Sequence, residues 1–194
     1  MRRLLLALLP AALAFASASP EKILEAINAR PGDTVCEIGA GDGSASIAAA
    51  RVVGPTGRVY TSELGESRVK KLRASIASSN LPQITVVEGE STSTNFPATC
   101  DAIWMRDVYH HFTDPAAMNA SIAASLKPGG RVAVVDFTPP DKEAADPAAR
   151  AKDGQHGVTP ETVTREMKDA GLYAVSTEKP GQRWFIVVLA KPAS

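Results

Sequence analysis

The sequence is poor in the residues that build metal clusters, disulfide frameworks and nucleic-acid surfaces. It holds two cysteines, Cys36 and Cys100, and three histidines, and aromatic residues make up 5% of it. The cysteines match neither zinc-ligand nor redox spacing, so we expect buried, inert thiols and no metal. Basic and acidic side chains balance at 21 each, and no basic run with interleaved aromatics occurs. This argues against nucleic-acid binding, and a small molecule is the expected partner.

The chain begins with a segment that is typical of export signals. "MRRLLLALLPAALAFASASP" has a basic start, an apolar stretch over residues 4–15 and small residues before Ala18. This pattern predicts a signal peptide over residues 1–18 and a single domain over residues 19–194. The alternative is an apolar amphipathic helix that leads into the domain. The apolar stretch is too short for a stable membrane span, so we expect an exported protein, periplasmic or secreted, if the leader is cleaved, and a cytoplasmic one otherwise.

Apolar runs of strand length alternate with helical patterns along most of the chain. This order is expected of an α/β fold with a parallel sheet and helices on both faces. Strands are predicted over residues 34–38, 57–62, 84–88, 101–106 and 131–137. Helices are predicted over residues 20–29, 44–53, 67–79 and 114–126, and "LKPGG" is predicted to break the chain after the last of these.

The final third ends in a reversed strand. After a polar connection, Thr159 is a predicted helix cap, Pro160 the first helical residue and Gly171 the stop signal. Residues 173–179 and 183–191 then read as strands that are separated only by a short turn. Such a pair forms an antiparallel hairpin, so one strand of the sheet runs against the others.

A glycine loop follows the first strand, in "TVCEIGAGDGS". Gly39, Gly41 and Gly43 allow the backbone to approach a ligand closely, and the following helix offers unpaired amides. The spacing G-x-G-x-G differs from the dinucleotide fingerprint, and Glu37 would repel a pyrophosphate. An acid in a buried strand needs a partner, so we expect Glu37 to face a cationic or amino-bearing ligand.

Five segments in this order resemble the class I S-adenosylmethionine-dependent methyltransferases, in their small-molecule branch. They are "VCEIGAGDG", the acid that ends "RVYTSE", "VVEGES", "CDAIWMRDVYHHFTDP" and "LKPGGRVAVVDF". The resemblance covers nearly everything from Pro20 to Pro192. It implies a Rossmann-like sheet of seven strands in the order 3-2-1-4-5-7-6, whose last-numbered strand is antiparallel. It also implies S-adenosylmethionine as the cofactor.

The same resemblance assigns residues to a site. Glu63 would hold the ribose hydroxyls, Glu90 would lie near the adenine, and Glu37 would hold the amino-acid end of the cofactor. The full cofactor set is Glu37, Gly39, Ala40, Gly41, Gly43, Glu63, Glu90, Ser91 and Arg106.

Candidates for proton transfer lie in "RDVYHHF", and they are Asp107, Tyr109, His110 and His111, of which Asp107 and the two histidines are the predicted catalytic residues. Neighbouring side chains on a helical turn point about 100° apart, so we expect His110 and His111 not to face the same ligand. By the resemblance, His111 lines the cofactor side, and His110 or Asp107 faces the acceptor. His156 precedes the last helix and either reaches the site as a base or stays solvated.

Two other functions are compatible with parts of the pattern. One is a binding protein that keeps the fold without catalysis, which an exported leader favours because S-adenosylmethionine is made in the cytosol. The other is an NAD(P)-dependent reductase, which Glu37, the glycine spacing and the terminal hairpin oppose. The sequence indicates neither the methyl acceptor nor the oligomeric state.

Overall fold

The computed structural model describes residues 18–152 and 156–193. A seven-stranded sheet has the order β3-β2-β1-β4-β5-β7-β6, in which β7 runs antiparallel to both β5 and β6 and the other pairs are parallel. The predicted topology is therefore confirmed. Of the predicted leader, all but Ala18 lies outside the described residues.

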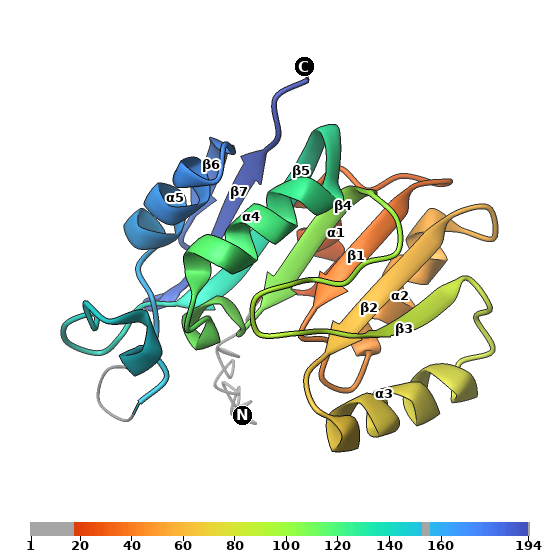
Figure 1. The fold of residues 1–194 in the computed structure, drawn as a ribbon. Coiled ribbons are helices and arrows are strands. Elements are labelled where there is room, and N and C mark those ends of the chain that lie inside the picture. The colour runs from red at the N-terminus through yellow and green to blue at the C-terminus, as the bar shows by residue number, and fades with distance from the viewer. Residues whose placement is uncertain (1–17, 153–155, 194) are drawn as a thin grey trace, which may run out of the picture.

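The strands and helices follow the predicted order along the chain (Figure 1). The strands are β1 Thr34–Ile38, β2 Arg58–Glu63, β3 Ile84–Glu88, β4 Cys100–Arg106, β5 Leu126–Phe137, β6 Tyr173–Glu178 and β7 Trp184–Ala190. The helices are α1 Pro20–Ala26, α2 Ser44–Val53, α3 Glu66–Ser78, α4 Pro115–Ser125 and α5 Pro160–Asp169, with the short 3-10 turns η1 Tyr109–His111 and η2 Pro147–Ala149.

The helix signals in the sequence act as expected. Thr159 caps α5, because its side chain accepts a hydrogen bond from the Thr162 amide at 3.2 Å, and Pro160 is the first helical residue. Asp114 caps α4 in the same way through the Ala117 amide at 3.0 Å. These local bonds satisfy amides that have no partner inside the helix.

The segment "LKPGG" differs from its prediction as a chain break. β5 begins at Leu126, which pairs with Cys100, and the register then shifts so that Arg131 pairs with Ala102. The extra residues form an irregularity within the strand, where Gly129 adopts a φ of 77°. A bulge therefore replaces the predicted break, because the neighbouring strand continues the pairing on both sides of it.

The sheet separates two apolar cores. Helices α4 and α5 cover one face, and α1 and α2 cover the other, with α3 packed along β2 and β3 (Figure 1). Side chains of one strand alternate between the cores: Val35 packs with Ala49 and Leu72, whereas Cys36 packs on the side of Ile122. No helix within residues 18–152 and 156–193 is long and apolar enough to cross a membrane.

Cys36 and Cys100 form a disulfide, with their Cα atoms 6.1 Å apart. The prediction of two inert thiols is wrong. Both residues are fully buried in the core beneath α4 and α5. They lie 64 positions apart in the sequence, and only the pairing of β1 with β4 brings them together.

Candidate active site

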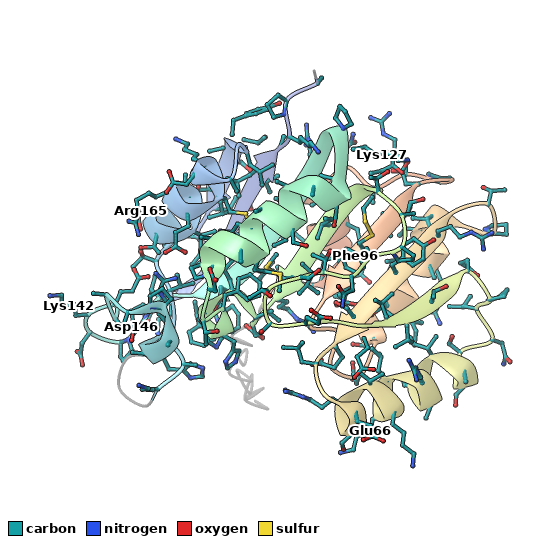
Figure 2. The ribbon with its side chains drawn as sticks, viewed as in Figure 1. Glu66, Phe96, Lys127, Lys142, Asp146 and Arg165 are labelled. Carbon is teal, nitrogen blue, oxygen red and sulfur yellow. A yellow bond between two sulfur atoms is a disulfide. The ribbon has the colours of Figure 1, made fainter. Side chains whose placement is uncertain are left out.

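The carboxyl ends of β1, β2 and β4 meet at a cavity of about 350 Å³. The strand order reverses between β1 and β4, and ligands of open α/β sheets bind at such a point. At the opposite ends of the strands, Lys127 forms an ion pair with Asp101 at 2.7 Å. Figure 2 shows Lys127 on the other side of the molecule from Asp146. Seven of the predicted site residues line the cavity, namely Gly39, Glu63, Glu90, Ser91, Arg106, Asp107 and His111.

The glycine loop is shaped by its packing. Gly39 has a φ of 71°, and a Cβ atom there would collide with the side chain of Val108. Gly43 has a φ of 80°, and a Cβ atom there would lie 2.8 Å from Leu72 of α3. The amides of Gly39 and Ala40 both donate to the carbonyl of Ser62, at 2.9 Å. Glycine is therefore required at both positions, and the loop is held against the end of β2.

Glu63 ends β2 and connects it to this loop. Its Oε2 accepts a hydrogen bond from the Gly41 amide at 2.9 Å, and its Oε1 accepts one from the Leu64 amide at 2.9 Å. Arg68 of α3 approaches Oε1 to 3.7 Å. The carboxylate is buried yet lines the cavity, so it is held in place before any ligand arrives.

Glu37 is buried in β1 with 4% of its surface exposed, and it is not among the residues that line the cavity. Ser46 of α2 donates a hydrogen bond to its Oε2. Burial raises the pKa of Glu37 to about 7, while the hydrogen bonds from Ser46 and Trp104 and the charge of Arg106 act in the opposite direction. The hydroxyl of Ser46 is thus a hydrogen-bond partner of Glu37 in the structure. Contact between Glu37 and a cofactor stays a prediction.

His110 lies inside the protein on η1, with 1% of its surface exposed. Its Nδ1 lies 2.8 Å from Oδ1 of Asp136 on β5, and the other oxygen of Asp136 accepts from the His110 amide at 3.2 Å. Asp136 is itself fully buried. The sequence did not predict this pair, because Asp136 lies 26 positions from His110, near the end of an apolar strand. No local pattern indicates that Asp136 faces a histidine.

His110 and His111 lie close together but differ in exposure, because His110 is buried and is not among the residues that line the cavity, whereas His111 is exposed and lines it. Their ring centroids are 4.1 Å apart, and Nε2 of His156 lies 2.8 Å from Nε2 of His110. Both residues lie on η1, and their rings are inclined to each other at 42°. Burial and the neighbouring histidines lower the pKa of His111.

Asp107 occupies a strained backbone position at the end of β4. Its φ is 60°, and its amide donates to the carbonyl of Val135 at 2.9 Å. Burial raises the pKa of its carboxyl, as does the nearby charge of Asp136. Left-handed backbone at a residue other than glycine costs of order 1–3 kcal/mol and concentrates at functional sites, so this position fits the predicted role of Asp107 near the acceptor.

A buried arginine anchors the connection that carries His156. Arg150 donates to both oxygens of Glu166 on α5, at 3.1 and 2.6 Å, and lies 3.5 Å from Glu143. Tyr109 of η1 donates to Glu166 at 3.0 Å. These contacts hold Arg150, in the described part of the connection between β5 and α5, against α5 and η1. They were not predicted because Arg150 lies in a polar, alanine-rich segment without periodicity, 16 positions from Glu166.

A family model described as a methyltransferase domain matches residues 2–177. The chain belongs to this methyltransferase family. A ubiquinone/menaquinone biosynthesis C-methyltransferase from Marinomonas is 30% identical over 116 residues, which are 59% of this chain and 46% of that protein. A nocamycin O-methyltransferase from Saccharothrix syringae is 30% identical over 61% of this chain and 43% of its own length. This methyltransferase-domain chain thus spans about half the length of the curated relatives it matches.

Among solved structures, an S-adenosylmethionine-dependent methyltransferase from Aquifex aeolicus shares the fold. Its TM-score is 0.75 at 23% identity, and the alignment covers 88% of each chain. At this identity the likeness concerns the architecture. Ligands of open α/β sheets bind where the strand order reverses, and in this fold the cavity at the ends of β1, β2 and β4 lies at that point.

Proposed function

We propose that this protein transfers methyl groups from S-adenosylmethionine to a small molecule. The observation that carries the proposal is the position of Glu63, which lines the cavity and is bonded to the glycine loop through the Gly41 amide. A buried carboxylate at the end of the second strand suits the two hydroxyls of a ribose, because it accepts hydrogen bonds through both oxygens. Membership of the methyltransferase family supports the same conclusion.

The cavity wall suits a ligand that carries charges of both signs. Glu63, Glu90 and Asp107 line it together with Arg68 and Arg106. When bound, S-adenosylmethionine supplies a methyl group activated on a positively charged sulfur. The arginines would attract its carboxylate, and the acids would stabilise its cationic groups. A ligand without a pyrophosphate group therefore accounts for the acids and arginines that line the cavity.

The histidines give the acceptor side a group that can remove a proton. Asp136 accepts a hydrogen bond from Nδ1–H of His110, so Nε2 of His110 carries the lone pair. A positive charge that forms on this ring is stabilised by the buried carboxylate behind it. His111 stands between this dyad and the cavity. Such an arrangement serves acceptors, such as hydroxyl groups, that must lose a proton on methylation.

Calorimetry with S-adenosylmethionine tests the cofactor assignment. We expect Glu63→Ala to weaken binding by about 1–3 kcal/mol, which is roughly a 5- to 150-fold rise in Kd. The matched control is Glu88→Ala, because Glu88 is exposed and pairs in register with Glu63 on the neighbouring strand. We expect the control to bind as the wild type does.

Three outcomes would contradict parts of the proposal. Binding of NADH without binding of S-adenosylmethionine would identify a reductase, and unchanged affinity in Glu63→Ala would refute the site. Binding of the cofactor with no methyl transfer to any member of a panel of phenols, alcohols, amines and quinols would identify a binding protein without catalysis.

The proposal extends to the compartment. Disulfides persist in oxidising compartments, and Cys36 and Cys100 form one in the core. This agrees with the export pattern of the first residues. We therefore propose that the protein acts outside the cytosol, where S-adenosylmethionine must reach it from the compartment that makes it.

A further inference from the structure

All three histidines of the chain converge on one point. His110 and His111 lie on η1, and His156 lies 46 positions beyond His110, just before α5. One ring nitrogen of each histidine lies within 4.8 Å of one ring nitrogen of the other two. A chain with so few histidines has no compositional reason to bring them together, and no sequence motif predicted the cluster.

The most buried of the three is oriented by a carboxylate. Nδ1 of His110 lies 2.8 Å from Oδ1 of Asp136, whose oxygens also accept from the amides of His110 and Phe137, at 3.2 and 2.8 Å. Nε2 of His110 is therefore directed at the other two histidines. A histidine that binds a metal through one nitrogen almost always gives the other nitrogen to a carboxylate or carbonyl, which fixes the ring.

The spacing of the rings is close to that of a metal site. Ligand nitrogens about 2.0–2.1 Å from a tetrahedral ion lie about 3.3 Å apart. Nε2 of His110 and Nε2 of His156 are 2.8 Å apart, and the widest separation in the cluster is 4.8 Å. His111 and His156 are exposed, so the proposed site requires their side chains to adjust around His110, whose ring is held by Asp136.

An ion at this point would replace an existing contact, because Nε2 of His110 and Nε2 of His156 lie at hydrogen-bond distance from each other, 2.8 Å. The acid in contact with the rings is Asp136, whose Oδ1 lies 2.8 Å from Nδ1 of His110. Of the cations, Arg183 donates to the carbonyl of His156 and lies over the ring of Phe137.

We propose that His110, His111 and His156 bind one divalent transition-metal ion, of the class that imidazole prefers, such as zinc, cobalt, nickel or copper. Asp136 is the positioning residue that aims His110 at the ion. Three protein ligands leave a fourth position, as in catalytic rather than structural zinc sites. Because His111 lines the cavity, that position opens toward it, where the ion would polarise an oxygen of a bound acceptor.

This inference revises the expectation that the chain lacks a metal. The expectation came from the absence of ligand spacing in the sequence, whereas the ligands here come from two segments that the fold joins. The inference does not rest on the proposed methyl transfer, since binding is measured without cofactor or acceptor. Nε2 of His110 either accepts a proton or binds the ion, so the metal would replace the dyad as the group that activates the acceptor.

The test is a titration of the untagged, chelator-treated protein with Co²⁺, followed by visible absorption and calorimetry, with Zn²⁺ as competitor. We expect one equivalent of Co²⁺ to bind with the intense visible bands of a tetrahedral site, and Zn²⁺ to remove them. We expect His156→Ala and His111→Ala each to lose at least tenfold in affinity. The control is Lys152→Ala, an exposed side chain of the same connection, which should bind as the wild type does.

The positioning role of Asp136 has a separate readout. Asp136→Asn should lower the affinity for Co²⁺ by about 10- to 100-fold and shift the visible bands while the protein stays folded by circular dichroism. The histidine variants concern exposed side chains, so a folding defect does not obscure them. Equal binding by the wild type, His111→Ala and His156→Ala, or no visible bands on the wild type, would overturn the proposal, whatever the protein does with S-adenosylmethionine.

Discussion

Two buried carboxylates differ in how completely their neighbours satisfy them. Asp136 accepts hydrogen bonds from the ring of His110 and from two backbone amides. The Glu37 carboxylate accepts a hydrogen bond from the hydroxyl of Ser46. A buried charge without sufficient donors costs several kcal/mol, so Glu37 holds its proton to higher pH, and burial raises its pKa to about 7.

The stability of the protein should therefore fall with pH through Glu37. Folded Glu37 keeps a proton that the unfolded chain releases above the ordinary value of 4.5, so the free energy of unfolding decreases between about pH 4.5 and about pH 7 and is flat above that range. The decrease amounts to about 3 kcal/mol. Glu37→Gln carries no charge, and urea unfolding across this range should show that the variant lacks this decrease.

The control for this prediction is Glu88→Gln, which removes an exposed acid from β3. A change of slope with pH that appears equally in Glu88→Gln and in Glu37→Gln would not be assigned to Glu37. Parallel stability profiles of Glu37→Gln and the wild type would show that Glu37 is ionised in the folded protein at low pH.

At the scale of elements, the disulfide joins two adjacent strands of the sheet. Cys36 lies in β1 and Cys100 begins β4, and both face the core beneath α4 and α5. The bond closes a loop that contains α2, α3 and the strands β2 and β3. Because it restricts the unfolded chain over 64 positions, it limits the conformations that this half of the sheet gains on unfolding.

Reduction of this bond should destabilise the protein by about 4 kcal/mol. Urea unfolding of the wild type, with and without a thiol reductant, measures the change. The double variant Cys36→Ala, Cys100→Ala should show no response to the reductant. Detection of free thiols in the oxidised, denatured wild type would contradict the disulfide itself.

At the scale of the whole molecule, the parallel sheet places the functional groups at one edge. The loops that follow β1, β2 and β4 meet there, and the connection between β5 and α5 brings His156 to the same end. The buried ion pairs of Arg150 hold that connection in place. The cavity and the histidine cluster together draw on residues from Ile38 to His156.

The compartment is a property of the whole chain, and it can be measured in the native cells. We expect the protein in the exported fraction, with a mature amino terminus at Ser19, because the leader pattern ends at Ala18 and the disulfide requires oxidising conditions. Fractionation followed by amino-terminal sequencing measures both, with a cytosolic enzyme as the marker of leakage. An intact Met1 in the cytosolic fraction would exclude export.

The order of the elements, their caps and the topology of the sheet could be predicted, because they depend on periodicity and on residues a few positions apart. The glycine loop and Glu63 were also visible, since they follow strands directly. The sequence by itself thus determined the fold and the position of the glycine loop and Glu63 at the carboxyl ends of their strands. Only the tertiary structure decided the disulfide, the Asp136–His110 pair and the meeting of His156 with His110, because those partners lie 26 to 64 positions apart. Which strands and turns become neighbours, rather than any local pattern, sets such contacts.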